Sequence, residues 1–271
     1  MKKNKGDSYM YTKADLLENL AEMGLKPTDT LMVHASMKSV GPVEGGADTV
    51  LDAFMEYFRE GLFLMPTHTW STIKKDNPVF DPKTAPACIG LLPNLLRQRP
   101  GVLRSLHPTH SVAAWGPRAA EFIAGEENAT SPCTPGGCWD RLREEDAKIL
   151  LLGVTHNRNT FLHSVDEALG IPDRLTPDRV LLHTVMPDGT LHDTWMHRHY
   201  NSTYGSGAYA EYYNKLKQAF YDLGAAKPTR FGDAECILCE ARKLYGVCKK
   251  LYAIEENCVI DRETIPESWW K

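Results

Sequence analysis

Three residues that follow an apolar, strand-like run have the types and spacing for acid–base chemistry. Lys148 to Val154 is the most strand-like run of the chain, and Thr160, His163 and Glu167 follow it at i, i+3 and i+7. This spacing places them on one face of a helix, with His163 and Glu167 close enough to pair. The helix dipole would keep the imidazole neutral, and a carboxylate would orient it and stabilise its protonated form, as in a catalytic triad. The alternative is an ordinary exposed pair of side chains.

A small-residue loop offers a second kind of chemistry, the binding of phosphate or carbonyl oxygens. The segment HASMKSVGPVEGGAD, residues 34–48, leaves a predicted strand over 30–34 and enters a predicted helix. Loops of this kind expose backbone N–H groups to anions. The segment is neither a Walker loop nor a GxGxxG turn, and a surface connection is equally compatible with it. The ligand-binding interpretation assigns His34, Ser36, Met37, Lys38, Ser39, Val40 and Gly41.

A third candidate group surrounds an arginine in the segment RSLHPTHS, residues 104–111. Arg104 could pair with a phosphate group, and the hydroxyls of Ser105 and Ser111 could donate hydrogen bonds to it. His68, in the segment PTHTW, is a candidate for contact with a substrate. For each of these residues the alternative is a buried side chain whose hydrogen bonds are satisfied within the protein.

The sequence gives little support to metal chemistry. It contains no HExxH and no GxSxG segment, and its ten histidines are scattered. Cys236, Cys239, Cys248 and Cys258 have spacings that a zinc site could use. However, residues 232–254 have apolar side chains at helical spacing, which favours a helix with structural thiols. We therefore predict no metal, and keep a zinc-bearing binding protein as an alternative.

The elements that must position these residues follow an α/β order. Strands are predicted over 30–34, 61–65, 111–115 and 148–154, and helices over 12–24, 48–58, 89–98, from 117 and over 160–169. Two further strands, 179–185 and 190–196, flank the hairpin signal Pro187-Asp188-Gly189, and the C-terminal third is expected to be mostly helical. This order predicts a mixed central sheet flanked by helices, in a single domain over residues 1–271.

Composition narrows the class of protein. The chain has 271 residues, 42% hydrophobic and 24% charged, with a net charge of −4 and no basic block. These values are typical of a globular protein and argue against nucleic acid as the main partner. The N-terminus lacks the apolar stretch of a signal peptide, and no apolar run is long enough to cross a membrane. A cytoplasmic protein with free thiols is expected.

Five segments, taken in order, resemble a known family. They are VHASMKSVG (33–41), PTHTW (66–70), RSLHPTHSVAAWG (104–116), SPCTPGGCWDRL (131–142) and LLLGVTHNRNTFLHSVDE (150–167). Together they resemble the aminoglycoside N3-acetyltransferases, the antibiotic acetyltransferases outside the GNAT fold. The resemblance covers residues 12–175, and the region 176–271 diverges. Cys133 and Cys138 stand where the family would have small or hydroxyl residues.

The resemblance implies an antibiotic N-acetyltransferase-like fold, acetyl-CoA as donor, no metal, and a cationic amine as acceptor. The expected reaction is direct transfer of acetyl to the 3-amino group of an aminoglycoside in a ternary complex, with a role in antibiotic resistance; a homodimer is compatible with it. The family pattern maps onto Thr160, His163 and Glu167, with His163 and Glu167 as the general base and its partner. The acceptor pocket should be acidic, with Asp166 and Asp173 as candidates. A same-fold acetyltransferase with another amine acceptor is the alternative within enzymes.

Overall fold

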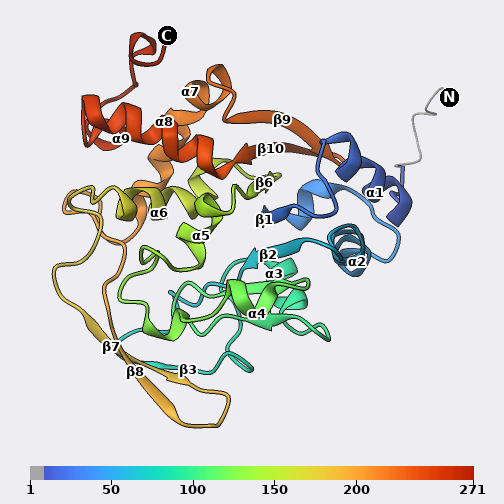
Figure 1. Cartoon of the computed structure of the whole chain (residues 1–271), viewed down its shortest axis with the longest axis horizontal. Helices are drawn as coiled ribbons and strands as arrows, with labels where there is room; N and C mark the ends of the chain where they lie inside the picture. The colour runs from blue at the N-terminus through green and yellow to red at the C-terminus, as the bar shows by residue number, and fades with distance from the viewer. Residues whose placement is uncertain (1–8) are drawn as a thin grey trace.

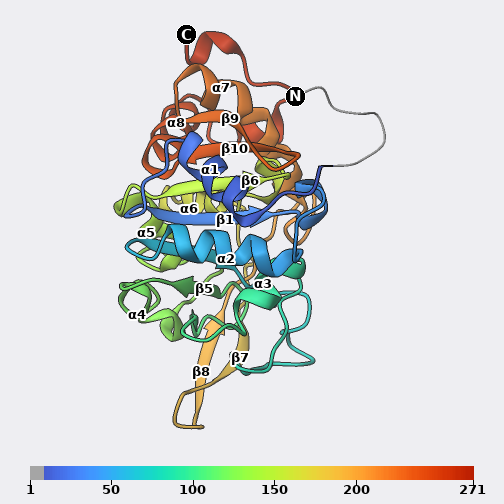
Figure 2. The same ribbon diagram turned by 90° about the vertical axis from the view of Figure 1, so that its right-hand side faces the viewer.

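A seven-stranded mixed sheet forms the centre of the molecule (Figure 2). The computed structural model describes residues 9–271. In spatial order the strands are β4 (Leu103–Arg104), β5 (Val112–Trp115), β2 (Leu62–Pro66), β1 (Thr30–Ala35), β6 (Lys148–Leu152), β10 (Ala234–Glu240) and β9 (Ala226–Phe231). β1 runs parallel to both β2 and β6, and antiparallel strands complete both edges. The predicted α/β fold with a mixed sheet is confirmed.

Helices cover both faces of this sheet, because the central strands alternate their side chains between two apolar clusters. In β1, Leu31 and Val33 belong to one cluster and Met32 to the other, and all three are fully buried. The helices of the first face are α1 (Lys13–Glu22), α2 (Ala47–Tyr57) and α3 (Leu91–Leu96). Those of the second are α5 (Cys138–Glu144), α6 (Phe161–Ala168), α7 (Lys217–Asp222) and α8 (Ala241–Ile254) (Figure 1).

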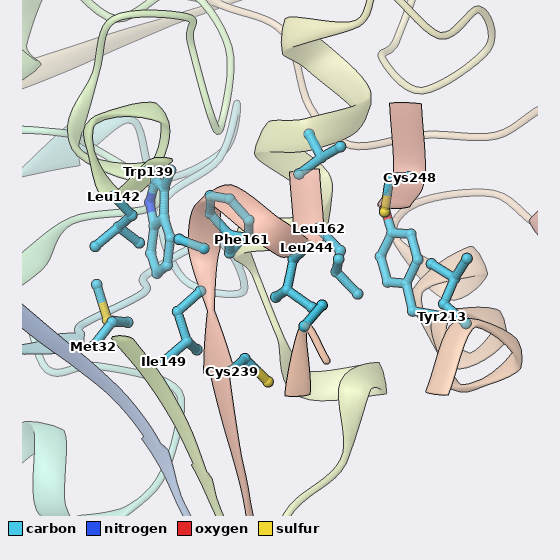
Figure 3. Packing of buried hydrophobic residues seen from close by; sticks show 14 of the residues in the cluster. Met32, Trp139, Leu142, Ile149, Phe161, Leu162, Tyr213, Cys239, Leu244 and Cys248 are labelled. Atoms are coloured by element: carbon cyan, nitrogen blue, oxygen red, sulfur yellow. The ribbon is translucent and has the colours of Figure 1, made fainter. Parts of the chain in front are cut away.

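Apolar packing fixes the helix that carries the candidate base. Phe161 and Leu162 of α6 belong to the same cluster as Trp139 of α5, Ile149 of β6 and Leu244 of α8 (Figure 3). None of these five side chains is more than 1% exposed. Burying an apolar side chain of this size contributes roughly 1.5–3 kcal/mol. The start of α6 is therefore held against the sheet, next to the end of β6.

The N-terminal helix, predicted over 12–24, begins with a capping box. The Thr12 backbone N–H donates to the Asp15 carboxylate at 2.7 Å, and the Asp15 N–H donates back to the Thr12 hydroxyl at 3.3 Å. These two bonds satisfy two of the N–H groups that a helix start leaves without partners. The start of α1 is thus set by local sequence.

The predicted hairpin is present and belongs to a separate small sheet. This sheet consists of β3 (Val79–Phe80), β7 (Val180–Val185) and β8 (Leu191–Met196), in that order. Gly189 closes the turn with φ of 86°, and the Met186 N–H donates to the Thr190 carbonyl at 2.8 Å. The hairpin projects from the main body (Figure 1). The segment that follows its second strand contributes Arg198 and His199 to the candidate site.

The prediction of a helix over 232–254 is wrong in its first half. Residues 234–240 form the buried strand β10, which pairs antiparallel with β6 and β9, and the helix α8 begins only at Ala241. Cys236 and Leu238 face one apolar cluster, and Ile237 and Cys239 face the other. A strand covered on both faces is apolar throughout, so its short run fits a helical period equally well.

The remaining helical elements are short. They are η1 (Met37–Val40), α4 (Ala119–Phe122), η2 (Glu126–Asn128), η3 (His156–Arg158), η4 (Ala208–Leu216), α9 (Cys258–Asp261) and η5 (Glu267–Trp269). Within residues 9–271, no helix combines the length and the apolar character that crossing a bilayer demands.

Candidate active site

A cavity of about 570 Å³ opens where the parallel strands β1, β2 and β6 end. His34 and Ala35 at the end of β1, His68 after β2 and Val154 after β6 line it. The carboxyl ends of parallel strands are the usual place for ligand sites in α/β sheets. Its other polar and charged lining residues are Thr109, His110, Asn157, Arg158, Asn159, Thr160, His163, Arg198, His199, Ser206 and Glu211.

Histidines form a stacked cluster along this cavity. The His163 ring lies on the His199 ring with centroids 4.0 Å apart, and the His110 ring lies 5.0 Å from His199 and 4.5 Å from His68. Burial lowers the pKa of His199 to about 3. Burial, together with the charges that His199 and Arg174 would carry, holds the pKa of His163 well below its ordinary value. The rings are therefore neutral at physiological pH.

Two tyrosines of η4 contact one nitrogen of His163. The Tyr209 hydroxyl lies 3.0 Å and the Tyr213 hydroxyl 3.1 Å from Nδ1. The Tyr213 hydroxyl also donates to Asp166 Oδ2 at 2.7 Å, and Arg174 Nε donates to the same carboxylate at 3.0 Å. All of these groups except the edge of the His163 ring are shielded from solvent.

These contacts decide which His163 nitrogen carries the proton. The Tyr213 hydrogen is committed to the Asp166 carboxylate, so the Tyr213 oxygen offers only a lone pair to Nδ1. The Tyr209 hydroxyl can likewise donate to the Arg174 carbonyl at 3.3 Å. Nδ1 therefore carries the hydrogen, and the neutral ring keeps its lone pair on Nε2. His163 lines the cavity, so this nitrogen is a candidate proton acceptor there.

Thr160 and His68, both predicted site residues, meet at the cavity wall. The Thr160 hydroxyl lies 3.0 Å from His68 Nε2. His68 Nδ1, His34 Nε2 and both amide atoms of Asn159 are buried without hydrogen-bond partners among the described residues. A buried polar atom without a partner costs roughly 1–3 kcal/mol. His34, His68 and Asn159 all line the cavity, so several side chains at its wall are incompletely paired within the protein.

The predicted pairing of His163 with Glu167 is wrong. Glu167 turns away from the ring: Oε1 accepts the Cys133 N–H at 2.9 Å and lies 3.2 Å from His199 Nε2, and Oε2 accepts the Ser131 hydroxyl. Burial raises the pKa of Glu167 to about 7, although the bonds from Ser131 and Cys133 oppose this. Four residues separate His163 and Glu167 along the helix, yet each finds partners from other segments.

The two predicted acceptor carboxylates lie outside the cavity. Asp166 is 1% exposed and is occupied by Arg174 and Tyr213. Asp173 is exposed, but its carboxylate accepts hydrogen bonds from Asn201 and from the backbone and hydroxyl of Ser202, so it holds a loop. Both assignments to the acceptor are corrected by these contacts.

The assignment of Arg104, Ser105 and Ser111 to the cofactor is also wrong. The Arg104 guanidinium donates to backbone carbonyls of Thr67, Pro82 and Ala85, and its Nε donates to two hydroxyls. Ser105 is fully buried and accepts the Val112 N–H at 3.0 Å, and Ser111 is fully buried as well. These polar residues are used to hold β4 and β5 to the segment after β2, rather than to bind a phosphate.

The residues of the predicted cofactor loop have different surroundings in the structure. His34 lines the cavity, while Val40 is fully buried and Gly41 turns the chain toward Asp233 with φ of 84°. The Ser39 hydroxyl donates to the Ser36 hydroxyl at 3.0 Å, at the point where the loop after β6 approaches most closely. The exposed or half-buried residues 36–39 stay candidates for ligand contact, and Val40 and Gly41 are corrected to structural roles.

The cavity is less acidic than predicted. Among the described residues, Glu211 is the one carboxylate in the lining, and it already accepts a hydrogen bond from Asn157 at 2.7 Å and lies 3.4 Å from Arg158. Arg198 adds a second cationic group and donates to the Trp70 carbonyl at 2.8 Å. No sequence pattern predicts five residues of this site, which are Arg198, His199, Tyr209, Glu211 and Tyr213. No motif or spacing marks these residues, because they come from the divergent region after 175.

The four C-terminal cysteines do not form a zinc site. Cys236 belongs to the apolar cluster on one face of the sheet, while Cys239, Cys248 and Cys258 belong to the other. Across residues 9–271, the one group with metal-ligand geometry is Cys133, Glu167 and His199, whose ligand atoms lie within 4.8 Å of one another. Glu167 and His199 already bond to each other there, and burial raises the pKa of Cys133 well above its ordinary value, which disfavours a thiolate.

Comparison with known proteins agrees with this geometry. A family model described as aminoglycoside 3-N-acetyltransferase matches residues 32–253. The chain belongs to this family. The match includes the ends of β1, β2 and β6, α6 and η4, which together surround the cavity.

Individual family members are similar over different lengths. Aminoglycoside N(3)-acetyltransferase IV of Salmonella sp. is 34% identical over 167 residues, which cover 60% of this chain and 62% of that relative. The alignment therefore spans less than two thirds of the relative's own length. A solved mutant of the acetyltransferase AAC(3)-IVa in complex with a gentamicin has a TM-score of 0.80 at 26% identity, covering 98% of this chain and 96% of that one. AAC-IIIb, solved with CoASH, shares the fold with a TM-score of 0.73 at 24% identity, covering 88% of this chain and 95% of that one.

Proposed function

We propose that this protein is an acetyl-CoA-dependent N-acetyltransferase that acetylates the 3-amino group of an aminoglycoside by direct transfer in a ternary complex. The observation that carries the proposal is His163, a neutral histidine whose hydrogen bonds leave Nε2 as a base in the cavity. Membership of the family supports the reaction class and the acceptor.

The proposed chemistry needs one positioned base. The acceptor amine is an ammonium at neutral pH and must lose a proton before its nitrogen can attack the thioester carbonyl. His163 Nε2 accepts that proton, directly or through a water molecule. After the attack the nitrogen carries one hydrogen more than the amide product, and this proton is lost to solvent. The tetrahedral intermediate collapses with cleavage of the C–S bond, and the imidazolium gives its proton to the leaving thiolate, so one proton is released for each acetyl group transferred. A positioned base contributes on the order of 10²–10⁴-fold to such a step, and the positioning of both substrates contributes much of the rest.

The loop after β1 is the proposed site for the acetyl-CoA thioester. Its backbone could stabilise the oxyanion. The Ser36 and Ser39 N–H groups already donate to the Leu152 and Ser36 carbonyls, so this role falls to the N–H groups of Met37 or Lys38. His34 and Asn159 line the same cavity.

The acceptor would occupy the side of the cavity formed by His68, Arg198 and Glu211. Glu211 can bind an ammonium group there. Two arginines also line the cavity and would repel a highly cationic acceptor. The substrate panel should therefore include amines with few and with many ammonium groups. A role in antibiotic resistance and a cytoplasmic location are proposed together with this acceptor.

Thiol release from acetyl-CoA across a panel of aminoglycosides and simpler amines tests the proposal. We expect His163→Ala to lower kcat by about 10²-fold or more, with the KM for acetyl-CoA within a few-fold of wild type, because the side chain acts on the proton. His192→Ala, on the projecting hairpin, is the matched control and should be normal. Near-normal turnover of a folded His163→Ala protein contradicts the base assignment.

Three further observations test separate parts of the proposal. Incubation with acetyl-CoA alone should give no acetylated protein by intact mass measurement, since direct transfer forms no acyl-enzyme. Acetylation of another amine but of no aminoglycoside would reject the acceptor and keep the base. Stoichiometric zinc in purified active protein would contradict the prediction of a metal-free enzyme.

A further inference from the structure

The side chain of Tyr213 connects the His163 ring to the Asp166 carboxylate. Tyr213 is buried, its hydroxyl lies 3.1 Å from His163 Nδ1, and the same hydroxyl donates to Asp166 Oδ2 at 2.7 Å. We propose that Tyr213 is a positioning residue that couples His163 to Asp166, fixing the tautomer of the ring and stabilising the imidazolium during transfer. The inference rests on the proposed role of His163 as the base.

The direction of each hydrogen bond gives the coupling its effect. Arg174 Nε donates to Asp166 at 3.0 Å and favours the carboxylate form, which then takes the hydrogen of Tyr213. A hydroxyl that donates to an anion becomes a stronger acceptor, because hydrogen bonds in a chain polarise one another. The bond from Nδ1–H to the Tyr213 oxygen therefore gains most when Nε2 takes a proton and the ring becomes cationic. No proton needs to leave Tyr213 or reach Asp166.

The neighbouring tyrosine provides the contrast. Tyr209 approaches Nδ1 equally closely, at 3.0 Å, but its hydroxyl has the Arg174 backbone carbonyl as its other partner, at 3.3 Å. A neutral, longer bond polarises the Tyr209 oxygen less than a carboxylate polarises Tyr213. The two hydroxyls thus touch the same nitrogen, and only one of them connects it to a charge.

Other groups around the ring do not replace Asp166. His199 stacks on His163 and is itself neutral, and Glu167 bonds to His199 rather than to His163. Arg174 is the cation closest to the chain of bonds, and its side chain pairs with the Asp166 carboxylate. The Asp166 carboxylate accepts hydrogen bonds from both Arg174 and Tyr213. It is therefore the charged group to which the relay, the hydrogen bonds from His163 through Tyr213 to Asp166, connects the imidazolium.

Tyr213→Phe and Tyr209→Phe are matched variants that each remove one hydroxyl from Nδ1. We expect Tyr213→Phe to lower kcat by roughly 10–100-fold and Tyr209→Phe by about threefold or less, with the KM for acetyl-CoA of both within about threefold of wild type. The solvent deuterium isotope effect on kcat should rise in Tyr213→Phe only, because proton transfer then limits the rate more strongly. Equal losses in the two variants, or an unchanged isotope effect in Tyr213→Phe, would overturn the proposal.

Histidine-labelled protein gives a readout that is independent of activity. Nitrogen NMR should show His163 as the Nδ1–H tautomer in the wild type and in Tyr209→Phe, and as a mixture of tautomers in Tyr213→Phe. An Nε2–H tautomer in the wild type rejects the relay even if a variant fails to fold. Failure of the proposed function looks different: His163→Ala would then turn over normally, whereas a failed relay leaves His163→Ala inactive and Tyr213→Phe active.

Discussion

Asp166 and Glu167 follow one another on α6, and their surroundings differ in almost every respect. Asp166 is 1% exposed and pairs with a guanidinium and a tyrosine hydroxyl. Glu167 pairs with no lysine or arginine of residues 9–271: hydroxyl, backbone and imidazole groups surround its carboxylate. Burial raises the pKa of both side chains, to about 7 for Glu167, while the Arg174 charge opposes the rise at Asp166.

The position of a side chain on a helix therefore does not determine its hydrogen-bond or ion-pair partner. Consecutive residues of an α-helix point about 100° apart. Asp166 therefore meets the segment after α6 and η4, which contribute Arg174 and Tyr213, while Glu167 meets the loop at 131–133 and His199. Helical spacing predicts that Glu167 lies beside the His163 ring; the hydrogen bonds that connect this ring to a carboxylate instead run through Tyr213 to Asp166.

The largest expected effect is the loss in the free energy of unfolding caused by Asp166→Asn. The substitution leaves the Arg174 side chain, which is 3% exposed, without its counter-charge. Removing one partner of a buried ion pair costs roughly 3–5 kcal/mol of the free energy of unfolding. Denaturant unfolding of Asp166→Asn and wild type at pH 7 measures the loss. Glu167→Gln, which leaves no arginine or lysine of the described chain unpaired, is the control and should lose much less. Equal losses in the two variants would remove the distinction between the two carboxylates.

The second test is the pH dependence of stability that Glu167 contributes. Its pKa of about 7 in the folded protein lies above the ordinary value of 4.5, so the folded state binds the proton more tightly. This contribution is fully present below about pH 4.5 and is lost as the pH rises through 7, about 3 kcal/mol in total. The wild-type free energy of unfolding minus that of Glu167→Gln should fall across this interval.

His199 titrates with the opposite sign and lies 3.2 Å from Glu167. Burial lowers its pKa to about 3, so its contribution to stability is lost as the pH falls below its unfolded value of 6.5. Because the two side chains are in contact, Glu167→Gln also changes the surroundings of His199, and the fall of the difference between pH 6.5 and 7 is the part that belongs to Glu167 alone. A difference that stays flat between pH 4.5 and 7 would show that Glu167 is ionised throughout, like an exposed carboxylate.

The smallest expected effect is on the KM for a polycationic acceptor, and it distinguishes two exposed carboxylates, one inside the cavity and one outside it. Glu211 lines the cavity, whereas Asp173 holds the loop at 201–202. Glu211→Gln should raise the KM for a polycationic acceptor by up to about fivefold, the range of an exposed ion pair, and flatten its increase with salt. Asp173→Asn should change neither quantity. A salt dependence that responds to Asp173 and not to Glu211 would place the acceptor elsewhere.

Much of the framework follows from local patterns. The strands β1, β2, β5 and β6, the helices α1 and α6 and the hairpin all lie where periodicity and turn residues predict them. The candidate base and the cavity residues Thr160, His68 and His34 also come from these patterns and from the family resemblance. The error at β10 has a local origin, since a short strand buried on both faces has no alternation to distinguish it from a helix.

Apolar periodicity and turn chemistry are local properties, so they predict which segments form the layers and that a histidine follows the strongest strand. The hydrogen-bond partners of the polar side chains depend instead on tertiary contacts. Tyr213 lies 50 residues from His163 in sequence, and His199 lies 32 from Glu167. The same applies to Arg104, whose charge suggested phosphate and whose neighbours turned out to be carbonyl oxygens. Hydrogen bonds and ion pairs act over a few ångströms, so the role of a polar side chain depends on which distant segments folding brings next to it.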